Sequence, residues 1–285
     1  MDVATAKLLI FCPDQRGIVA AVAGFITQFN GNILEADQHT DRDHGEFFMR
    51  VEFDREGCQL NPANFADAWR AVADKFKMRW RIHWAENRKR MAMLVSKQDH
   101  CLNDLLWRWR VGELNVDIPL VISNHDDLRS SVEGMGLPYQ HLAVTPANKS
   151  QQESRIRQLL ADANVDFVVL ARYMQILTPT LVDAYPERII NIHHSFLPAF
   201  AGAKPYHQAY DRGVKIIGAT SHYVTAELDQ GPIIALLTPQ GDHRDTVYDL
   251  VRKRRDLERV VLAAAVRAHT NDKVLVSRNK TVVFD

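Results

Sequence analysis

The sequence predicts an α/β protein with two domains, on the strength of three observations. Residues 7–84 follow the order strand, helix, strand, strand, helix, strand, which is a ferredoxin-like pattern. From Met91 onward, short apolar strands alternate with helical segments, as in a doubly wound, mostly parallel sheet. The charged run Glu86 to Arg90 separates the two patterns. We therefore expect an N-terminal domain at 1–85, a linker at 86–90 and a second domain at 91–285.

In the N-terminal domain, alternating apolar residues indicate the strands and apolar residues at three- and four-residue spacing indicate the helices. The expected strands are Lys7 to Cys12, Asn32 to Thr40, Glu46 to Phe53 and Met78 to Trp84, and the expected helices are Ile18 to Phe29 and Asn64 to Phe76.

In the second domain the expected strands are Met91 to Ser96, Asp117 to Ser123, Tyr139 to Val144, Asp166 to Leu170, Ile189 to His193, Lys215 to Val224 and Ile233 to Thr238. The expected helices are Leu102 to Val111, Gln151 to Ala163 and Thr246 to Ala268. Ligands of such sheets bind at the carboxyl ends of the strands, so functional side chains are sought there.

Composition narrows the class of protein. Lys plus Arg and Asp plus Glu both number 35 among 285 residues, so the totals imply no basic surface for nucleic acid. A hydrophobic content of 46% is ordinary for a globular protein. No apolar run is long enough to span a membrane, and the first residues lack the basic-then-apolar order of a signal peptide. We expect a cytoplasmic protein.

Cysteines and histidines favour neither disulfides nor a metal cofactor. Cys12, Cys58 and Cys101 are few and far apart, so we expect them to be reduced. The 12 histidines include no His-Glu-x-x-His pair. His193 and His194 are adjacent on a strand and would point to opposite faces. We expect no metal and no permanently bound cofactor.

Three polar side chains follow apolar strands in a way that suits acyl chemistry. Asn191 and His193 end an apolar strand, and Asp229 precedes the turn Gln230 to Pro232. An amide can donate to a developing oxyanion, an imidazole can move a proton, and a carboxylate can orient the imidazole or activate water. The alternative is that Asn191 and Asp229 are turn residues and His193 is a satisfied histidine at a strand end.

The motif around this trio resembles the folate-dependent formyltransferase family. The resemblance covers residues from about Arg90 to the C-terminus and is carried by Asn191-Ile192-His193-His194-Ser195-Phe196-Leu197-Pro198, Gly202, Pro205 and Leu228 to Ile234. It implies that Asn191, His193 and Asp229 are catalytic. Many members have proline at the position of His194. In this respect the sequence is similar to the members that remove the formyl group with water. The implied reaction is hydrolysis of 10-formyltetrahydrofolate to formate, which serves purine synthesis, and tetrahydrofolate.

A second group of residues follows the strand that ends at Leu170. Backbone groups of a turn after an apolar strand can read the polar edge of a flat heterocycle. In the resembled family this turn and the loop matching Val224 to Asp229 form the folate pocket. The implied folate-binding residues are Arg172, Met174, Gln175, Ile176, Leu177, Val224 and His222. Core packing of Met174 and Ile176, a structural role for Arg172 and packing of His222 are the alternatives.

The loop Ser96 to Leu102 bears on the formyl acceptor. Glycinamide ribonucleotide transformylases of the same family have a glycine-rich loop here that wraps the phosphate of their acceptor. This sequence has no glycine between Met91 and Val111, and Asp99 would repel a phosphate. We therefore expect water to be the acceptor. Formyl transfer to a small amine such as glycinamide ribonucleotide remains the alternative, with Lys97 and His100 as the phosphate ligands.

The N-terminal domain resembles the ACT regulatory domain. The resemblance rests on the turn Asp14-Gln15-Arg16-Gly17-Ile18 before a helix and on Asn32-Ile33 at the next strand. It implies a homo-oligomer in which domains pair side by side and bind a small amino acid between them. The implied effector residues are Asp14, Gly17, Ile18, Asn32 and Ile33, since amide groups at a helix start can hold a carboxylate. A dimerisation module without a ligand is one alternative. A non-catalytic amino-acid sensor is another, although a sensor would not need the trio.

Overall fold

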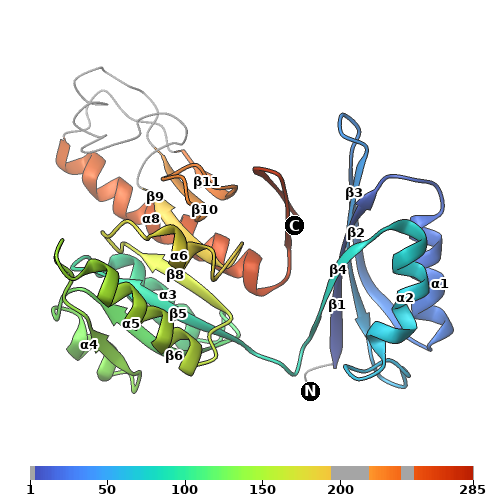
Figure 1. Ribbon diagram of the computed structural model, residues 1–285, viewed down its shortest axis with the longest axis horizontal. Helices are drawn as coiled ribbons and strands as arrows, with labels where there is room; N and C mark the ends of the chain where they lie inside the picture. Colours follow the sequence, from blue (N-terminus) through green and yellow to red (C-terminus); the bar gives the residue numbers. More distant parts are fainter. Residues whose placement is uncertain (1–3, 194–217, 239–246, 285) are drawn as a thin grey trace. The chain divides into compact units, whose positions relative to one another are not determined.

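The structure is a computed structural model that describes residues 4–193, 218–238 and 247–284. The chain forms two compact units, shown in Figure 1. One comprises Met1–Arg88, Asn271–Ser277 and Val282–Asp285, and the other comprises Lys89–Thr270 and Arg278–Thr281. Among the described residues, no helix is long and apolar enough to cross a membrane.

The first unit contains the expected ferredoxin-like pattern. Its elements are β1 (Thr5–Pro13), α1 (Ile18–Gln28), β2 (Asn32–Asp41), β3 (Glu46–Asp54), α2 (Phe65–Phe76) and β4 (Arg79–Trp84). The strands form an antiparallel sheet in the order β2-β3-β1-β4, and both helices lie on one side of it (Figure 1). Leu8, Ile10 and Cys12 of β1 point to that side and pack in one core with Trp69 and Phe25.

A C-terminal hairpin completes the other face of this sheet. It consists of β12 (Val274–Ser277) and β13 (Lys280–Val283). Leu275 and Phe284 pack with Leu9 and Phe48, which alternate away from the helices. The sequence-based division assigned these C-terminal residues to the second domain. The apolar residues on both faces of β1 explain the difference, because each face needs a cover.

The second unit is built on a seven-stranded sheet in the order β11-β10-β9-β8-β5-β6-β7. The strands are β5 (Lys89–Val95), β6 (Val116–Ser123), β7 (Tyr139–His141), β8 (Phe167–Ala171), β9 (Ile189–His193), β10 (Ala219–Tyr223) and β11 (Ile233–Leu237). All neighbours from β7 to β9 are parallel, and β10 is antiparallel to both β9 and β11. The prediction of a doubly wound, mostly parallel sheet is confirmed.

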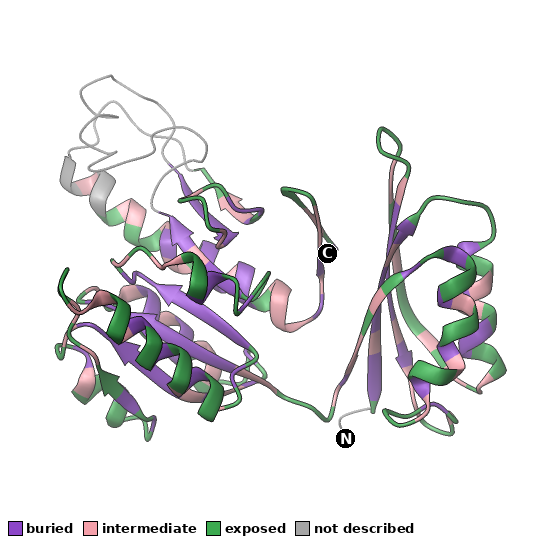
Figure 2. Cartoon of the chain, viewed as in Figure 1, coloured by how far each residue is buried: buried purple, intermediate pink, exposed green. Residues whose placement is uncertain are grey.

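Helices accompany this sheet at α3 (His100–Arg110), α4 (Arg129–Glu133), α5 (Lys149–Asp162), α6 (Pro179–Val182) and α8 (Val247–Thr270). The short helices α4 and α6 were not predicted, because four or five residues show no helical period. Ile156 and Leu160 of α5 pack on the apolar residues of β5, β6 and β8, and α8 contacts α3, β9, β10 and β11. Strands β5, β8 and β9 are buried along most of their length (Figure 2).

The strand order reverses direction at β5, in the middle of the sheet. From β5 the chain crosses through α3 to β6 on one side, while β8 pairs with β5 on the other side. Such a reversal of strand order leaves a crevice outside the carboxyl ends of the two central strands. The loops after β5 and β8 therefore border the place where this fold binds ligands.

Several predicted features fall partly outside the described residues. These are His194 to Pro198, Gly202 and Pro205 of the motif, the first three residues of the strand expected at Lys215 to Val224, and Thr246 of the last helix.

Candidate active site

Strand pairing brings the predicted amide and imidazoles to one face of the sheet. Asn191 and His193 are two residues apart on β9, so their side chains point to the same face. His222 of β10 lies directly opposite Asn191 in the antiparallel register. Directly opposed residues share a face, so Asn191, His193 and His222 lie together.

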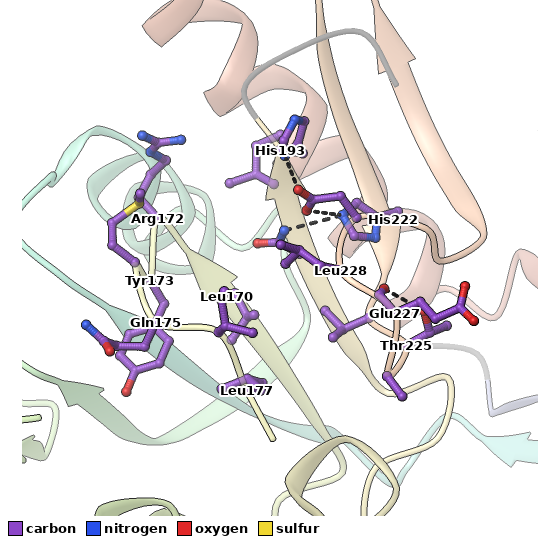
Figure 3. Close-up of a pocket in the computed structure, with 17 residues that line it drawn as sticks. Leu170, Arg172, Tyr173, Gln175, Leu177, His193, His222, Thr225, Glu227 and Leu228 are labelled. Atoms are coloured by element: carbon purple, nitrogen blue, oxygen red, sulfur yellow. Dashed lines mark hydrogen bonds and ion pairs between the residues drawn. The ribbon is translucent and has the colours of Figure 1, made fainter. Parts of the chain in front are cut away.

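Asp229 joins this group from the loop after β10. Its Oδ2 lies 3.2 Å from Nδ1 of His193, and its Oδ1 lies 3.8 Å from Nε2 of His222 (Figure 3). The side chain of His193 is 7% exposed and that of Asp229 is 17% exposed. The four side chains thus form one cluster of ionisable and amide groups, largely withdrawn from water.

The hydrogen bonds of His222 define its tautomer. Its Nδ1 lies 2.9 Å from the carbonyl oxygen of Tyr223, which can only accept, so Nδ1 carries the proton. Burial lowers the pKa of His222 below its ordinary 6.5, despite the opposing effects of the Tyr223 carbonyl and the Asp229 charge. The ring is therefore neutral at pH 7, and its Nε2 accepts from the Asn191 amide at 3.3 Å. This contact fixes the orientation of the Asn191 side chain.

A glycine holds the Asp229 loop against β10. A Cβ atom at Gly231 would lie 1.7 Å from the carbonyl oxygen of Tyr223, so only glycine fits without a shift of the backbone. The amide of Tyr223 donates to the carbonyl of Pro232 at 2.9 Å. Asp229 itself has a φ of 56°, a left-handed conformation that is uncommon outside glycine. The loop is thus shaped to aim one carboxylate at two histidines.

A cavity of about 260 Å³ opens beside this cluster. All ten residues predicted to be catalytic or folate-binding line it, from the ends of β8, β9 and β10 and the loops after β8 and β10 (Figure 3). Met174, Ile176 and Leu228 are exposed apolar side chains of its wall. They are not core residues, so the packing alternative for Met174 and Ile176 is wrong. An exposed apolar wall suits a flat aromatic ligand.

Three further lining residues, Leu170, Tyr173 and Ile192, were not predicted to belong to the pocket. Tyr173 and Ile192 each neighbour a predicted residue in the chain, and Leu170 lies in β8 just before Ala171. Their apolar character indicated only buried positions. Burial raises the pKa of Tyr173 to about 12, so its hydroxyl stays protonated at neutral pH.

The wall after β8 is tied to the end of β5. The amide of Met174 donates to Oγ of Ser96 at 3.0 Å, and that hydroxyl donates to Oδ1 of Asn124 at 2.6 Å. Arg172 adopts a φ of 63°, and its Nε donates to Oε1 of Gln98 at 2.9 Å. The pocket wall is therefore fixed from two neighbouring strands, which favours a preformed site.

The five predicted effector residues do not meet within one chain. Gly17 has a φ of 91° and precedes α1, and Ile18 is buried at its start. The turn from Asp14 follows Pro13, which lies opposite Glu46, whereas Asn32 and Ile33 begin β2 opposite Asp54 and Phe53. The two groups thus lie at opposite ends of β3, roughly 25 Å apart at the usual rise per strand residue. A single site made by all five within one chain is excluded.

Each of the two units matches a protein-family model. Residues 89–266 match the model described as formyl transferase, and residues 7–74 match the ACT domain.

Two of the relatives match nearly the full length of the chain. The chain is 54% identical to the formyltetrahydrofolate deformylase of Synechocystis sp., over 98% of each chain. It is similar to the crystal structure of a formyltetrahydrofolate deformylase from Pseudomonas syringae pv. tomato, with a TM-score of 0.97 and 50% identity over 100% of this chain and 96% of that one. A glycinamide ribonucleotide transformylase from Symbiobacterium toebii matches with a TM-score of 0.66 and 29% identity over 71% of this chain and 97% of that one.

Proposed function

This chain belongs to the formyltetrahydrofolate deformylase family, and we propose that its pocket hydrolyses 10-formyltetrahydrofolate to formate and tetrahydrofolate. The observation that carries the mechanism is the convergence of Asn191, His193 and Asp229 at one end of an apolar-walled cavity.

The pocket orients the formyl group. Met174, Ile176 and Leu228 offer apolar surface to the flat ring system of the folate. Backbone groups from Arg172 to Leu177 offer donors and acceptors to its polar edge. This arrangement places the formyl carbon beside the catalytic cluster, which removes the entropic cost of bringing the reactants together.

Water attack requires a base and an oxyanion donor. Nδ1 of His193 faces Asp229, so Nε2 is the nitrogen that takes a proton from water. The water oxygen bonds to the formyl carbon, and the carbonyl electron pair moves to oxygen. The Asn191 amide donates to that oxyanion with the hydrogen that is not bonded to His222. Asp229 stabilises the imidazolium that forms.

Collapse of the tetrahedral intermediate returns the proton. The oxyanion reforms the carbonyl, the bond from carbon to N10 breaks, and the imidazolium of His193 donates its Nε2 proton to N10. The products are tetrahydrofolate and formic acid, which loses a proton to water. His193 can take up and return this proton because the negative charge of Asp229 stabilises the protonated imidazole.

A formate-release assay without any acceptor tests this function. The purified chain should release one formate for each tetrahydrofolate formed. Glycinamide ribonucleotide should be neither formylated nor inhibitory. Turnover that depends on the amine would contradict hydrolysis and would make the chain a transferase.

The ACT domain suggests a small effector ligand for the first unit. We infer that this effector is an amino acid and that the chain is a homo-oligomer. A carboxylate suits the free amide groups at the start of α1, near Gly17 and Ile18. Asn32 and Ile33 of one chain reach the Asp14 turn only in a second copy, since one chain holds them at opposite ends of the sheet.

Light scattering and an amino-acid screen test the two parts of this inference on the full chain. We expect a mass above that of one chain, and a several-fold change of turnover with one amino acid, typical of coupling between sites. A monomer, or a turnover that no amino acid alters, would contradict the corresponding part.

A further inference from the structure

The backbone of Tyr223, the last residue of β10, supports two parts of the catalytic cluster. Its carbonyl accepts the Nδ1 proton of His222 at 2.9 Å, and its amide donates to the carbonyl of Pro232 at 2.9 Å. The second bond, together with the close approach of Gly231 to the Tyr223 carbonyl, fixes the loop that carries Asp229. The position of this one peptide segment therefore sets both the tautomer of His222 and the place of the Asp229 carboxylate.

The side chain of Tyr223 is fixed on the opposite face of the sheet. Strand alternation directs it away from the His222 ring, towards α8. It is 2% exposed, and its hydroxyl lies 2.7 Å from Nδ1 of His269, near the end of α8. The His269 ring packs in turn on the ring of Phe167, the first residue of β8, with ring centroids 4.7 Å apart. Tyr223 is thus held by its backbone on one face and by its hydroxyl on the other.

The end of α8 is itself anchored to the sheet. Nζ of Lys89, the first residue of β5, donates to the carbonyls of His269 and Thr270 at 3.0 and 3.1 Å. A lysine in this position satisfies the last carbonyls of a helix and complements their partial negative charge. Phe167 is fully buried, so it cannot move away from the imidazole without opening the core. His269 therefore offers the Tyr223 hydroxyl a fixed partner.

Satisfaction of a buried hydroxyl is the simplest role for such a contact, because a buried tyrosine usually finds a hydrogen-bond partner. Tyr139 shows this role, since its hydroxyl donates to the carbonyl of His125 at 2.6 Å. Tyr223 differs in its place in the chain. It lies between His222, whose ring orients the catalytic amide, and Val224, which lines the cavity. A shift of Tyr223 would therefore reach the site directly through the backbone.

We propose that Tyr223 and His269 are positioning residues of the hydrolytic site, and that their hydrogen bond holds the peptide segment that orients His222 and Asp229. Neither belongs to the described residues that line the cavity, so both act through the backbone and not by contact with the substrate. The consequence for turnover rests on the proposed hydrolytic function, whereas the effect on the His222 ring does not.

Nitrogen NMR of the histidine rings in the full chain tests the positioning without substrate. In the wild type near pH 7 the His222 ring should be neutral and protonated at Nδ1, and its signals are identified by their loss in His222→Gln. Tyr223→Phe and His269→Ala should each shift part of the His222 population to the Nε2 tautomer, because the Tyr223 carbonyl is no longer held in place. Tyr139→Phe is the matched control, since it also removes a buried tyrosine hydroxyl but on β7, at the other end of the sheet. It should leave the His222 signals unchanged.

Formate release measures the consequence for catalysis. Tyr223→Phe and His269→Ala should each lower kcat about tenfold and leave the KM for the folate nearly unchanged, because misplaced catalytic groups weaken the transition state more than substrate binding. The double variant should lose no more than either single variant, since both changes remove the same bond. His269→Asn keeps a polar atom near the place of Nδ1 and should recover most of the loss. Tyr139→Phe should keep the wild-type kcat.

Thermal unfolding shows whether each variant is folded, and His269→Ala decides the matter if Tyr223→Phe is not. An unchanged His222 ring, a wild-type kcat in a folded variant, or losses that add in the double variant would overturn the proposal. A wild type that releases no formate would instead contradict the hydrolytic function, and the NMR result would then decide the positioning role by itself.

Discussion

Two carboxylates of the second unit, Asp229 and Glu258, have opposite surroundings. Asp229 faces the imidazoles of His193 and His222, and it borders the cavity. Glu258 faces two arginines, whose charge is permanent, together with His100, and it is fully buried.

This difference separates a site that can take part in proton transfer from a site whose charges stay fixed. A carboxylate beside histidines can balance a charge that appears during a reaction. A carboxylate held by arginines is fixed as an anion and can only position its neighbours. Mutations should therefore affect turnover at Asp229 and stability at Glu258.

The largest expected effect is on stability at Glu258. Glu258→Gln should lower the free energy of unfolding by about 3 kcal/mol, because it leaves buried cations without their counter-charge. The native pKa of Glu258 is below its ordinary value of 4.5, so its contribution is complete above that value and is lost as the pH falls through the native pKa.

Urea unfolding at several pH values measures this contribution. The difference between wild type and Glu258→Gln should be constant near pH 7 and should shrink in acid. A difference that grows in acid would contradict the ion-pair account.

The next effect is on turnover at the trio. His193→Ala and Asp229→Asn should each lower turnover by about two orders of magnitude or more, the usual contribution of a general base and its partner. Folate binding should persist, because these groups act on the transition state. Asp183→Asn removes an exposed carboxylate at the end of α6 and serves as the control. Near-normal turnover in either variant would contradict the catalytic role of the residue that was replaced.

The sequence predicted the trio but not the Glu258 cluster, for a physical reason. Asn191 and His193 share a face by strand alternation, and Asp229 follows a neighbouring strand, so topology alone brings them together. Glu258 and His100 meet through the packing of α8 on α3, which no local pattern encodes.

Long-range pairing also decides how far apart the predicted effector residues of the first unit lie within one chain. The Asp14 turn and Asn32 each have the expected local structure, but the register of β3 places them at opposite ends of the sheet. The C-terminal hairpin gave a similar lesson. The sequence shows that its residues are apolar, but it does not show which of the two units they pack against.

A smaller effect is expected at Gly231, which shapes the loop that carries Asp229. Gly231→Ala should lower turnover about tenfold and destabilise the chain by about 1 to 3 kcal/mol, because the added methyl group collides with the Tyr223 carbonyl. Gly24→Ala is the control, since a Cβ there meets no atom within 4 Å and alanine favours a helix. Thermal unfolding and formate release, measured on both variants, distinguish the two sites; equal behaviour would show that the close approach does not matter.

The smallest effect concerns His222, which we interpret as a positioning residue. His222→Ala should lower turnover about tenfold, because the Asn191 amide loses the acceptor that orients it. Gln at this position offers an oxygen near the place of Nε2, so His222→Gln should recover most of the loss. A purely structural histidine would show no such rescue.

The pH dependence of stability provides a second measurement on His222. Burial lowers the native pKa of His222. Below about pH 6.5, its ordinary pKa, the imidazole is therefore protonated in the unfolded chain but stays neutral in the folded chain. The contribution of neutral His222 is therefore complete above about pH 6.5 and declines as the pH falls. Between pH 7 and 5, urea unfolding of His222→Gln should lose less stability than that of the wild type. An equal or steeper loss in the variant would show that another group titrates, and the rescue by glutamine would then have to stand on turnover alone.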